Sequence, residues 1–200
     1  MKQLLAAILI TIAWVPAQAQ ELPALYDVID VRSDDVLNVR AGAGTSHPIV
    51  GELAWNQRGV EVLRVNNTRR WGLVSSGGWT GWASMKFLRR QARYDASLFP
   101  ARLWCVGTEP FWAIQFDSGT MSYQSPDAPN VTDPVDWTGA SSNVGSNAFG
   151  FSTLRTSGVV RRGQCSDGMS DRLFGYEIHA VRHDGATVGL LSGCCTMQAP

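Results

Sequence analysis

Alternation of apolar and polar residues, interrupted by a glycine-rich loop, is the feature that most constrains the fold of this chain. It is clearest in residues 36–53, where Leu37 and Val39 alternate with Asn38 and Arg40. A period of two is typical of a strand with one buried face. The next residues include two glycines, a threonine, a serine and a proline, which favour a loop. The segment therefore predicts a strand, a loop and a second strand.

The same pattern continues as far as residue 91. Short alternating segments at 59–65, 71–74 and 79–83 are separated by the turn sequences Asn-Asn-Thr and Ser-Ser-Gly-Gly. Short strands at regular spacing with glycine-rich turns favour a small β-barrel over a helical domain.

These segments also carry motifs in a fixed order. The sequence LNVRAGAGTSHPIVGEL at 37–53 resembles the signature segment of bacterial SH3 (SH3b) domains. The sequences GVEV, WGLV and GWAS, at 59–62, 71–74 and 81–84, resemble three further motifs of that family. The resemblance covers residues 20–92. It implies an SH3-like small barrel that binds peptidoglycan peptides of the bacterial cell wall.

Aromatic residues supply the candidate binding surface of this domain. Trp55 and Trp79 lie beside turns and are bulkier than is usual in the family, and both a stacking surface and a structural role are open for them. Trp71 and Trp82 occupy family positions that imply core packing. Rings with a few polar groups suit an extended peptide. The candidate ligand-binding residues are Asn38, Arg40, Trp55, Trp71 and Trp79.

Residues 1–19 have the organisation of a signal peptide. A lysine near the start is followed by an apolar run from Leu4 to Val15 and then by Ala17-Gln18-Ala19. The run is short for a membrane span, and the last three residues fit a cleavage site. No cysteine follows the run, so the segment lacks the acceptor of a lipoprotein. We expect a periplasmic or secreted protein without a membrane span after cleavage, and a retained anchor is the alternative.

A linker at 93–102, whose apolar end should dock, precedes a second domain at 103–200. Strand-like segments flank a polar stretch, 125–147, that we expect to contain a long loop and a short strand around 135–137. No segment has a convincing helical pattern. The expected fold class is all-β, an SH3-like small barrel followed by a disulfide-stabilised antiparallel β-barrel or sandwich.

All four cysteines lie in this second domain: Cys105, Cys165, Cys194 and Cys195. In an exported protein they favour disulfides, and several pairings are open. Adjacent residues on a strand point to opposite faces, so Cys194 and Cys195 should have different partners.

The second domain carries motifs of its own. The sequences CVGTEPFW, CSDGMSD and GCC, at 105–112, 165–171 and 193–195, resemble a family of uncharacterised bacterial envelope domains. This resemblance implies no activity. An exported, disulfide-stapled barrel is also similar in architecture to small periplasmic lysozyme inhibitors.

Three loop residues, Glu109, Asp167 and Asp171, are the candidate functional acids. Glu109 precedes Pro-Phe-Trp, where apolar neighbours suit a general acid, whereas the structural alternative is a carboxylate that caps backbone N–H groups. The two aspartates flank a glycine without the alternating oxygens of an EF-hand, which favours a turn-stabilising pair. His179 and His183 stand far apart on a strand. No metal site, cofactor or catalytic residue is predicted.

The expected function is that of a non-catalytic envelope protein whose first domain binds a cell-wall peptide or an envelope protein. A formal net charge of +0 gives no long-range attraction to nucleic acid. Two other classes stay open. One is a cell-wall hydrolase, and the other is an inhibitor of a lytic enzyme with the second domain as effector.

Overall fold

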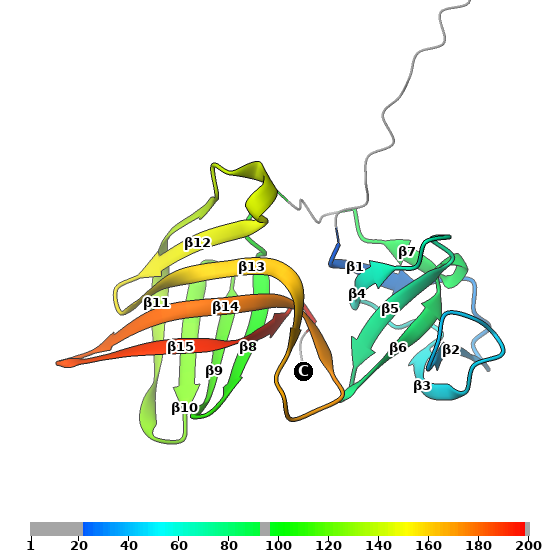
Figure 1. The fold of residues 1–200 in the computed structure, drawn as a ribbon, viewed down its shortest axis with the longest axis horizontal. Helices are drawn as coiled ribbons and strands as arrows, with labels where there is room; N and C mark the ends of the chain where they lie inside the picture. The colour runs from blue at the N-terminus through cyan, green and yellow to red at the C-terminus, as the bar shows by residue number, and fades with distance from the viewer. Residues whose placement is uncertain (1–21, 93–96, 199–200) are drawn as a thin grey trace, which may run out of the picture.

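Two antiparallel sheets follow one another along the chain (Figure 1). The structure, a computed structural model, describes residues 22–92 and 97–198. The expected signal peptide at 1–19 and part of the expected linker at 93–102 lie outside the described residues. We call the two sheets the N-terminal sheet and the C-terminal barrel.

The N-terminal sheet has seven strands in the order β3-β2-β6-β5-β4-β1-β7. Its strands are short because glycine-rich turns interrupt the alternation. Gly77 and Gly78 in the β5–β6 turn have φ angles of 53° and 91°, a region that glycine adopts without strain. The strands are β1 (Ala24–Val28), β2 (Val36–Arg40), β3 (Ile49–Ala54), β4 (Val60–Val65), β5 (Trp71–Ser76), β6 (Trp79–Ser84) and β7 (Leu88–Arg90), with a 3-10 segment, η1 (Met85–Phe87), before β7.

One buried cluster holds the N-terminal sheet together. It includes Leu53 from β3 and Leu88 from β7, which are the two outermost strands, together with Val39 and Val74 from central strands. A flat sheet would keep its two edges far apart, since neighbouring strands are spaced by about 4.8 Å. The sheet therefore curls around a single core.

The C-terminal barrel is closed, and each strand pairs with its neighbours in sequence before β15 returns to β8. Alternation again sets the buried face. On β14, for example, Tyr176, Ile178 and Ala180 are buried. The strands are β8 (Arg102–Thr108), β9 (Phe111–Asp117), β10 (Thr120–Ser125), β11 (Ala128–Ala140), β12 (Ala148–Thr153), β13 (Thr156–Ser166), β14 (Leu173–Asp184) and β15 (Thr187–Thr196), and a 3-10 segment, η2 (Val144–Ser146), precedes β12.

The all-β prediction is confirmed. Across residues 22–92 and 97–198, the helical segments are the two short 3-10 turns, η1 and η2. Neither turn has the length and apolar character of a membrane-spanning helix.

The expected short strand around 135–137 is part of a much longer one, so the expectation of a long loop within 125–147 is wrong. β11 occupies Ala128–Ala140 and pairs with β10 on one side and β12 on the other. Most of its side chains are exposed, including that of Trp137. The segment therefore lacks the alternation of apolar and polar residues from which a strand is predicted. Hydrogen bonds to its two neighbours, rather than a buried apolar face, hold β11 extended.

Aromatic rings fill part of the barrel core. The ring centroids of Phe116 and Phe151 lie 4.9 Å apart in an edge-to-face arrangement. Phe99, which precedes β8, packs on these two rings at 5.1 and 6.1 Å. The apolar end of the expected linker thus docks on the barrel core, as the sequence indicates.

Both disulfides belong to the C-terminal barrel and use neighbouring residues of β15. Cys105 is bonded to Cys195, and Cys165 to Cys194. Cys105 and Cys195 lie directly opposite each other on β8 and β15 and are completely buried. Cys194 points to the other face of β15, so the expectation that the adjacent cysteines have different partners is confirmed.

One part of the outer surface of the N-terminal sheet, around Glu61 and Thr80, packs on the C-terminal barrel. Glu61 on β4 is buried there, and its carboxylate accepts a hydrogen bond from the Thr196 hydroxyl at 2.7 Å. The same carboxylate accepts a second bond from the backbone N–H of Met197 at 3.1 Å. A third bond runs from the backbone N–H of Leu173 to the Thr80 hydroxyl at 2.8 Å. The end of β15 and the start of β14 therefore fix the two units to each other.

Candidate functional site

An arginine stacked on a tryptophan marks one face of the N-terminal sheet. The guanidinium carbon of Arg64 on β4 lies 4.9 Å from a ring centroid of Trp82 on β6, which is cation–π geometry. Trp82 pairs with Leu73 and Arg40, and Arg64 pairs with the same Leu73. Directly paired residues share a sheet face. This is the outer face, because Val74, the neighbour of Leu73, belongs to the core.

Three predicted ligand-binding residues lie on this outer face. Asn38 and Arg40 alternate with a core valine on β2, and Trp71 lies two residues before Leu73 on β5. Arg40 also donates a hydrogen bond from its guanidinium to the carbonyl of His47 at 2.8 Å, which holds the β2–β3 loop. We call the set of Arg40, Arg64, Trp71 and Trp82 the arginine–tryptophan face.

The tryptophans correct the sequence-based assignments. Trp71 and Trp82, both expected in the core from their family positions, are half-buried and lie outside the core cluster. Trp79, a candidate for the binding surface, packs against the core instead, and its ring lies so close to Gly51 that a Cβ there would be 2.5 Å away. Trp55 is 43% exposed in the turn after β3. The five predicted ligand-binding residues therefore do not share one face.

A groove on the outside of the C-terminal barrel is a second candidate site. Its volume is about 570 Å³, a size typical of ligand sites. Its floor consists of residues such as Val106, Ala113 and Gln124, which alternate with core residues on β8, β9 and β10 and so point outward. The β13–β14 loop, with Asp167 and Met169, forms one wall.

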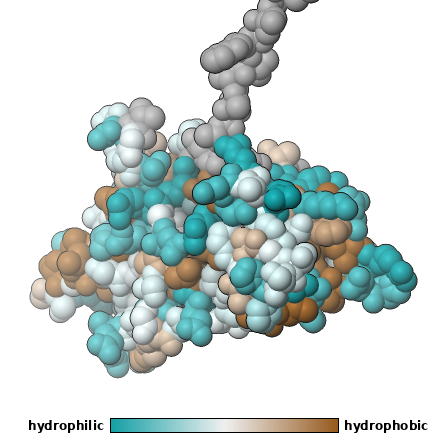
Figure 2. Space-filling view, turned by 45° about the vertical axis from the view of Figure 1, so that its right-hand side comes forward, coloured by the Kyte–Doolittle hydropathy of each residue, from teal (hydrophilic) through white to brown (hydrophobic). Residues whose placement is uncertain are grey.

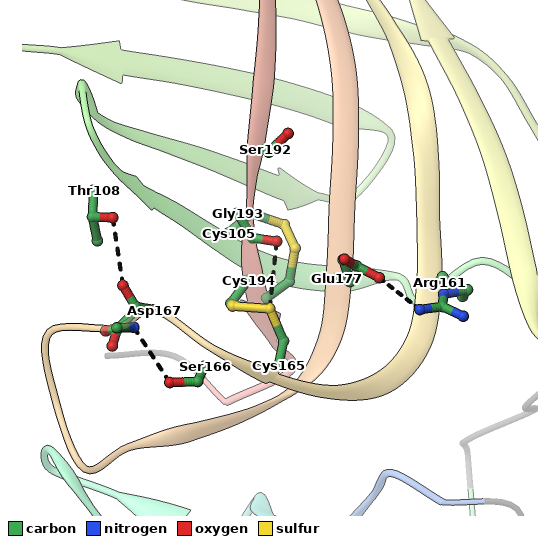
Figure 3. The surroundings of a disulfide bond; sticks show 12 residues. Cys105, Thr108, Arg161, Cys165, Ser166, Asp167, Glu177, Ser192, Gly193 and Cys194 are labelled. Atoms are coloured by element: carbon green, nitrogen blue, oxygen red, sulfur yellow. Dashed lines mark hydrogen bonds and ion pairs between the residues drawn. A yellow bond between two sulfur atoms is a disulfide. The ribbon is translucent and has the colours of Figure 1, made fainter.

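The loop that forms this wall is fastened to the barrel (Figure 3). The Cys165–Cys194 disulfide ties the start of the loop to β15, and the Thr108 hydroxyl donates to the carbonyl of Asp167 at 3.5 Å. The carboxylate of Asp167 accepts hydrogen bonds at 3.0 Å from two backbone N–H groups of its own loop. Two of the motif segments of the second domain, 105–112 and 165–171, thus line one groove, and the Cys165–Cys194 disulfide connects the third segment to its wall.

Among the described residues, the candidate acids do not converge on one centre. Glu109 is exposed in the β8–β9 turn, without the apolar enclosure that suits a general acid. Asp167 has the turn-stabilising role that the sequence favoured for it, and Asp171 is exposed in the same loop.

The two histidines lie on the outer surface of the barrel. His179 contacts the Ser192 hydroxyl at 3.0 Å and the Glu177 carboxylate at 3.2 Å, and His183 is exposed further along β14. In the part of the chain that the structure describes, no three metal-ligating side chains come together.

Comparison with protein-family models, with curated proteins and with solved structures finds no match to this chain. Function is therefore inferred from the chemistry of the two surfaces described above.

Removing the loop disulfide should release the groove wall. In a Cys165→Ala, Cys194→Ala variant we expect trypsin to cut after Arg172 at least about tenfold faster, because proteolysis requires local opening and the disulfide restrains it. Limited proteolysis followed by mass spectrometry measures the rate. Cleavage after Arg102, outside the loop, is the internal control. An unchanged rate at Arg172 would show that other contacts hold the loop.

Proposed function

We propose that this chain is an exported, non-catalytic envelope protein that binds the peptide part of peptidoglycan through its N-terminal sheet. The observation that carries the proposal is the arginine–tryptophan face, where Arg64 stacks on Trp82. The order of SH3b-like motifs and the organisation of residues 1–19 also support it. Two disulfides are compatible with an oxidising compartment outside the cytoplasm.

The chemistry of the arginine–tryptophan face suits a peptide that carries carboxylates. A guanidinium pairs with a carboxylate through two parallel hydrogen bonds. Because Arg64 is already held over Trp82, binding costs less side-chain entropy than it would for a free arginine. Trp71, half-buried on the same face, offers an apolar surface for a neighbouring methyl group. Peptidoglycan peptides combine these two features, free carboxylates and small apolar side chains.

Loss of the stacked guanidinium should weaken wall binding. In residues 20–200, we expect Arg64→Gln to reduce affinity for purified peptidoglycan about fivefold, since an exposed charge-assisted contact is worth about 1 kcal/mol. Co-sedimentation at low and moderate salt measures the bound fraction. Arg161→Gln, which removes one exposed arginine from the C-terminal barrel, is the matched control. Absence of binding by the wild-type chain, or equal binding by the two variants, would contradict the proposal.

The hydrolase and inhibitor alternatives are separable in the same preparation. A zymogram with cell-wall substrate shows clearing by a hydrolase, and clearing that disappears in Glu109→Gln would identify Glu109 as its acid. Lysozyme activity measured with and without the chain tests inhibition, and a reduced rate would favour the inhibitor.

A further inference from the structure

The groove on the C-terminal barrel is not used by the proposed function and has a distinct chemistry. Its lining is mainly apolar, with neutral hydrogen-bonding side chains such as Thr108, Gln124 and Asn130 among the apolar ones. It lies on the outer surface of β8–β10, separate from the arginine–tryptophan face on β2–β6.

Two large apolar side chains border the groove without being covered. Phe111 on β9 is 56% exposed and Met169 on the loop is 65% exposed. Neither helps to form the barrel core, so folding alone does not account for their position. An exposed aromatic ring and a flexible thioether together suit an apolar side chain of a partner. Figure 2 shows that hydrophobic residues are interspersed with hydrophilic ones over the face in view.

The charge around the groove is negative. Among the described residues that line it, Asp167 is the sole ionisable one. Partial burial acts to raise the pKa of Asp167. Hydrogen bonds from Met169 and Ser170, together with the charge of Arg172, outweigh this effect and hold the pKa below the usual value. Glu109 and Asp127 are exposed in the two turns that adjoin the lining residues.

The basic residue whose charge acts on Asp167, Arg172, lies outside the groove lining. Arg172 stacks on the ring of Phe174, with 4.8 Å between the guanidinium carbon and the ring centroid. Among the described residues that line the groove, a carboxylate or phosphate would meet only the negative charge of Asp167, which attracts an ammonium or guanidinium group.

From these observations we infer that the groove binds an extended basic segment of a partner protein. An apolar side chain of the segment lies between Phe111 and Met169, and a lysine or arginine points to Asp167. The hydroxyl of Thr108 and the amides of Gln124 and Asn130 are available to the backbone of the segment. This inference goes beyond the proposed function and does not depend on it.

Blocked six-residue peptides test the ligand class. We expect residues 20–200 to bind a peptide that alternates lysine and leucine at least about tenfold more tightly than one that alternates glutamate and leucine, or lysine and serine. Isothermal titration at low and moderate salt measures the three affinities, and the affinity of the lysine–leucine peptide should fall as salt rises. Equal binding of the glutamate peptide, or absence of binding by all three, overturns the inference.

Variants locate the binding. Met169→Ser and Asp167→Asn should each weaken binding of the lysine–leucine peptide about fivefold or more, because one removes an apolar wall and the other a charge while keeping an oxygen acceptor for the loop. Leu190→Ser, which changes another exposed apolar residue on the distant part of β15, is the matched control. Equal affinity in all three variants places the peptide elsewhere and overturns the inference. Arg64→Gln should leave peptide affinity unchanged, so this test and the peptidoglycan test fail independently.

Discussion

A Cys105→Ala, Cys195→Ala variant should lose about 4 kcal/mol of unfolding free energy, because the core disulfide closes a loop that approaches the length of the barrel. The two cysteines are 90 residues apart in sequence. Their bond joins the first and last strands of the barrel, which pair only at Trp104, Cys105 and Val106 of β8. In the described residues this is the shortest seam of the barrel, so little else keeps it closed.

Chemical denaturation of the oxidised wild-type chain and the variant measures this difference. The loop-disulfide variant, Cys165→Ala with Cys194→Ala, is the matched comparison, since its cysteines are 29 residues apart. Its loss should be smaller by about 1 kcal/mol on loop length alone. If the Cys105→Ala, Cys195→Ala variant is as stable as the oxidised wild type, strand pairing alone is enough to keep the barrel closed.

Between pH 5 and pH 8, the free energy of unfolding should fall by about 2 to 3 kcal/mol because Glu61 is buried between the two units. Burial raises the pKa of this carboxyl from an ordinary 4.5 to about 7, although the bonds from Thr196 and Met197 and the charge of Arg172 act to lower it. Below pH 4.5 the group is protonated whether the chain is folded or unfolded. Above that pH the unfolded chain releases the proton first, so stability decreases until the folded protein also ionises near pH 7.

Denaturation at a series of pH values tests this dependence, with Glu61→Gln as the decisive variant. The amide does not titrate, so the slope between pH 5 and pH 8 should largely disappear. Glu52→Gln, which changes an exposed glutamate on β3, should retain the wild-type slope. The same slope in Glu61→Gln as in the wild type would assign the pH dependence to other groups.

Local alternation explains how much of the fold can be predicted. Alternation correctly predicts the strand that contains Leu37 and Val39 and the strand β14, because each of them has one buried face. Alternation fails to predict β11, because most of its side chains are exposed. Its extended conformation depends on pairing with β10 and β12. The pattern also cannot choose between the possible disulfide pairings, because these depend on β15 returning to β8.

The candidate sites show the same limit. The sequence analysis singles out Trp71 and Trp82. Arg64 reaches Trp82 only because a shift in register between β4 and β5 pairs it with Leu73, which in turn pairs with Trp82. The groove depends on Thr108 meeting Asp167, 59 residues later in the chain. The cysteine-containing motifs in the sequence indicate that these segments are joined by disulfides. They do not indicate that a groove forms between the segments.

The position of β15 also determines the order in which a newly made chain can be completed. The N-terminal sheet finds all its strand partners within residues 24–90, so it is complete while the barrel sequence is still to come. The barrel seam, the core disulfide and the bonds to Glu61 all depend on Cys194–Met197. A chain that emerges with its N-terminus first therefore holds its second unit open until these last strand residues arrive. A change confined to this short stretch would therefore remove the pairing of β15 with β8, the Cys105–Cys195 disulfide and the hydrogen bonds to Glu61 together.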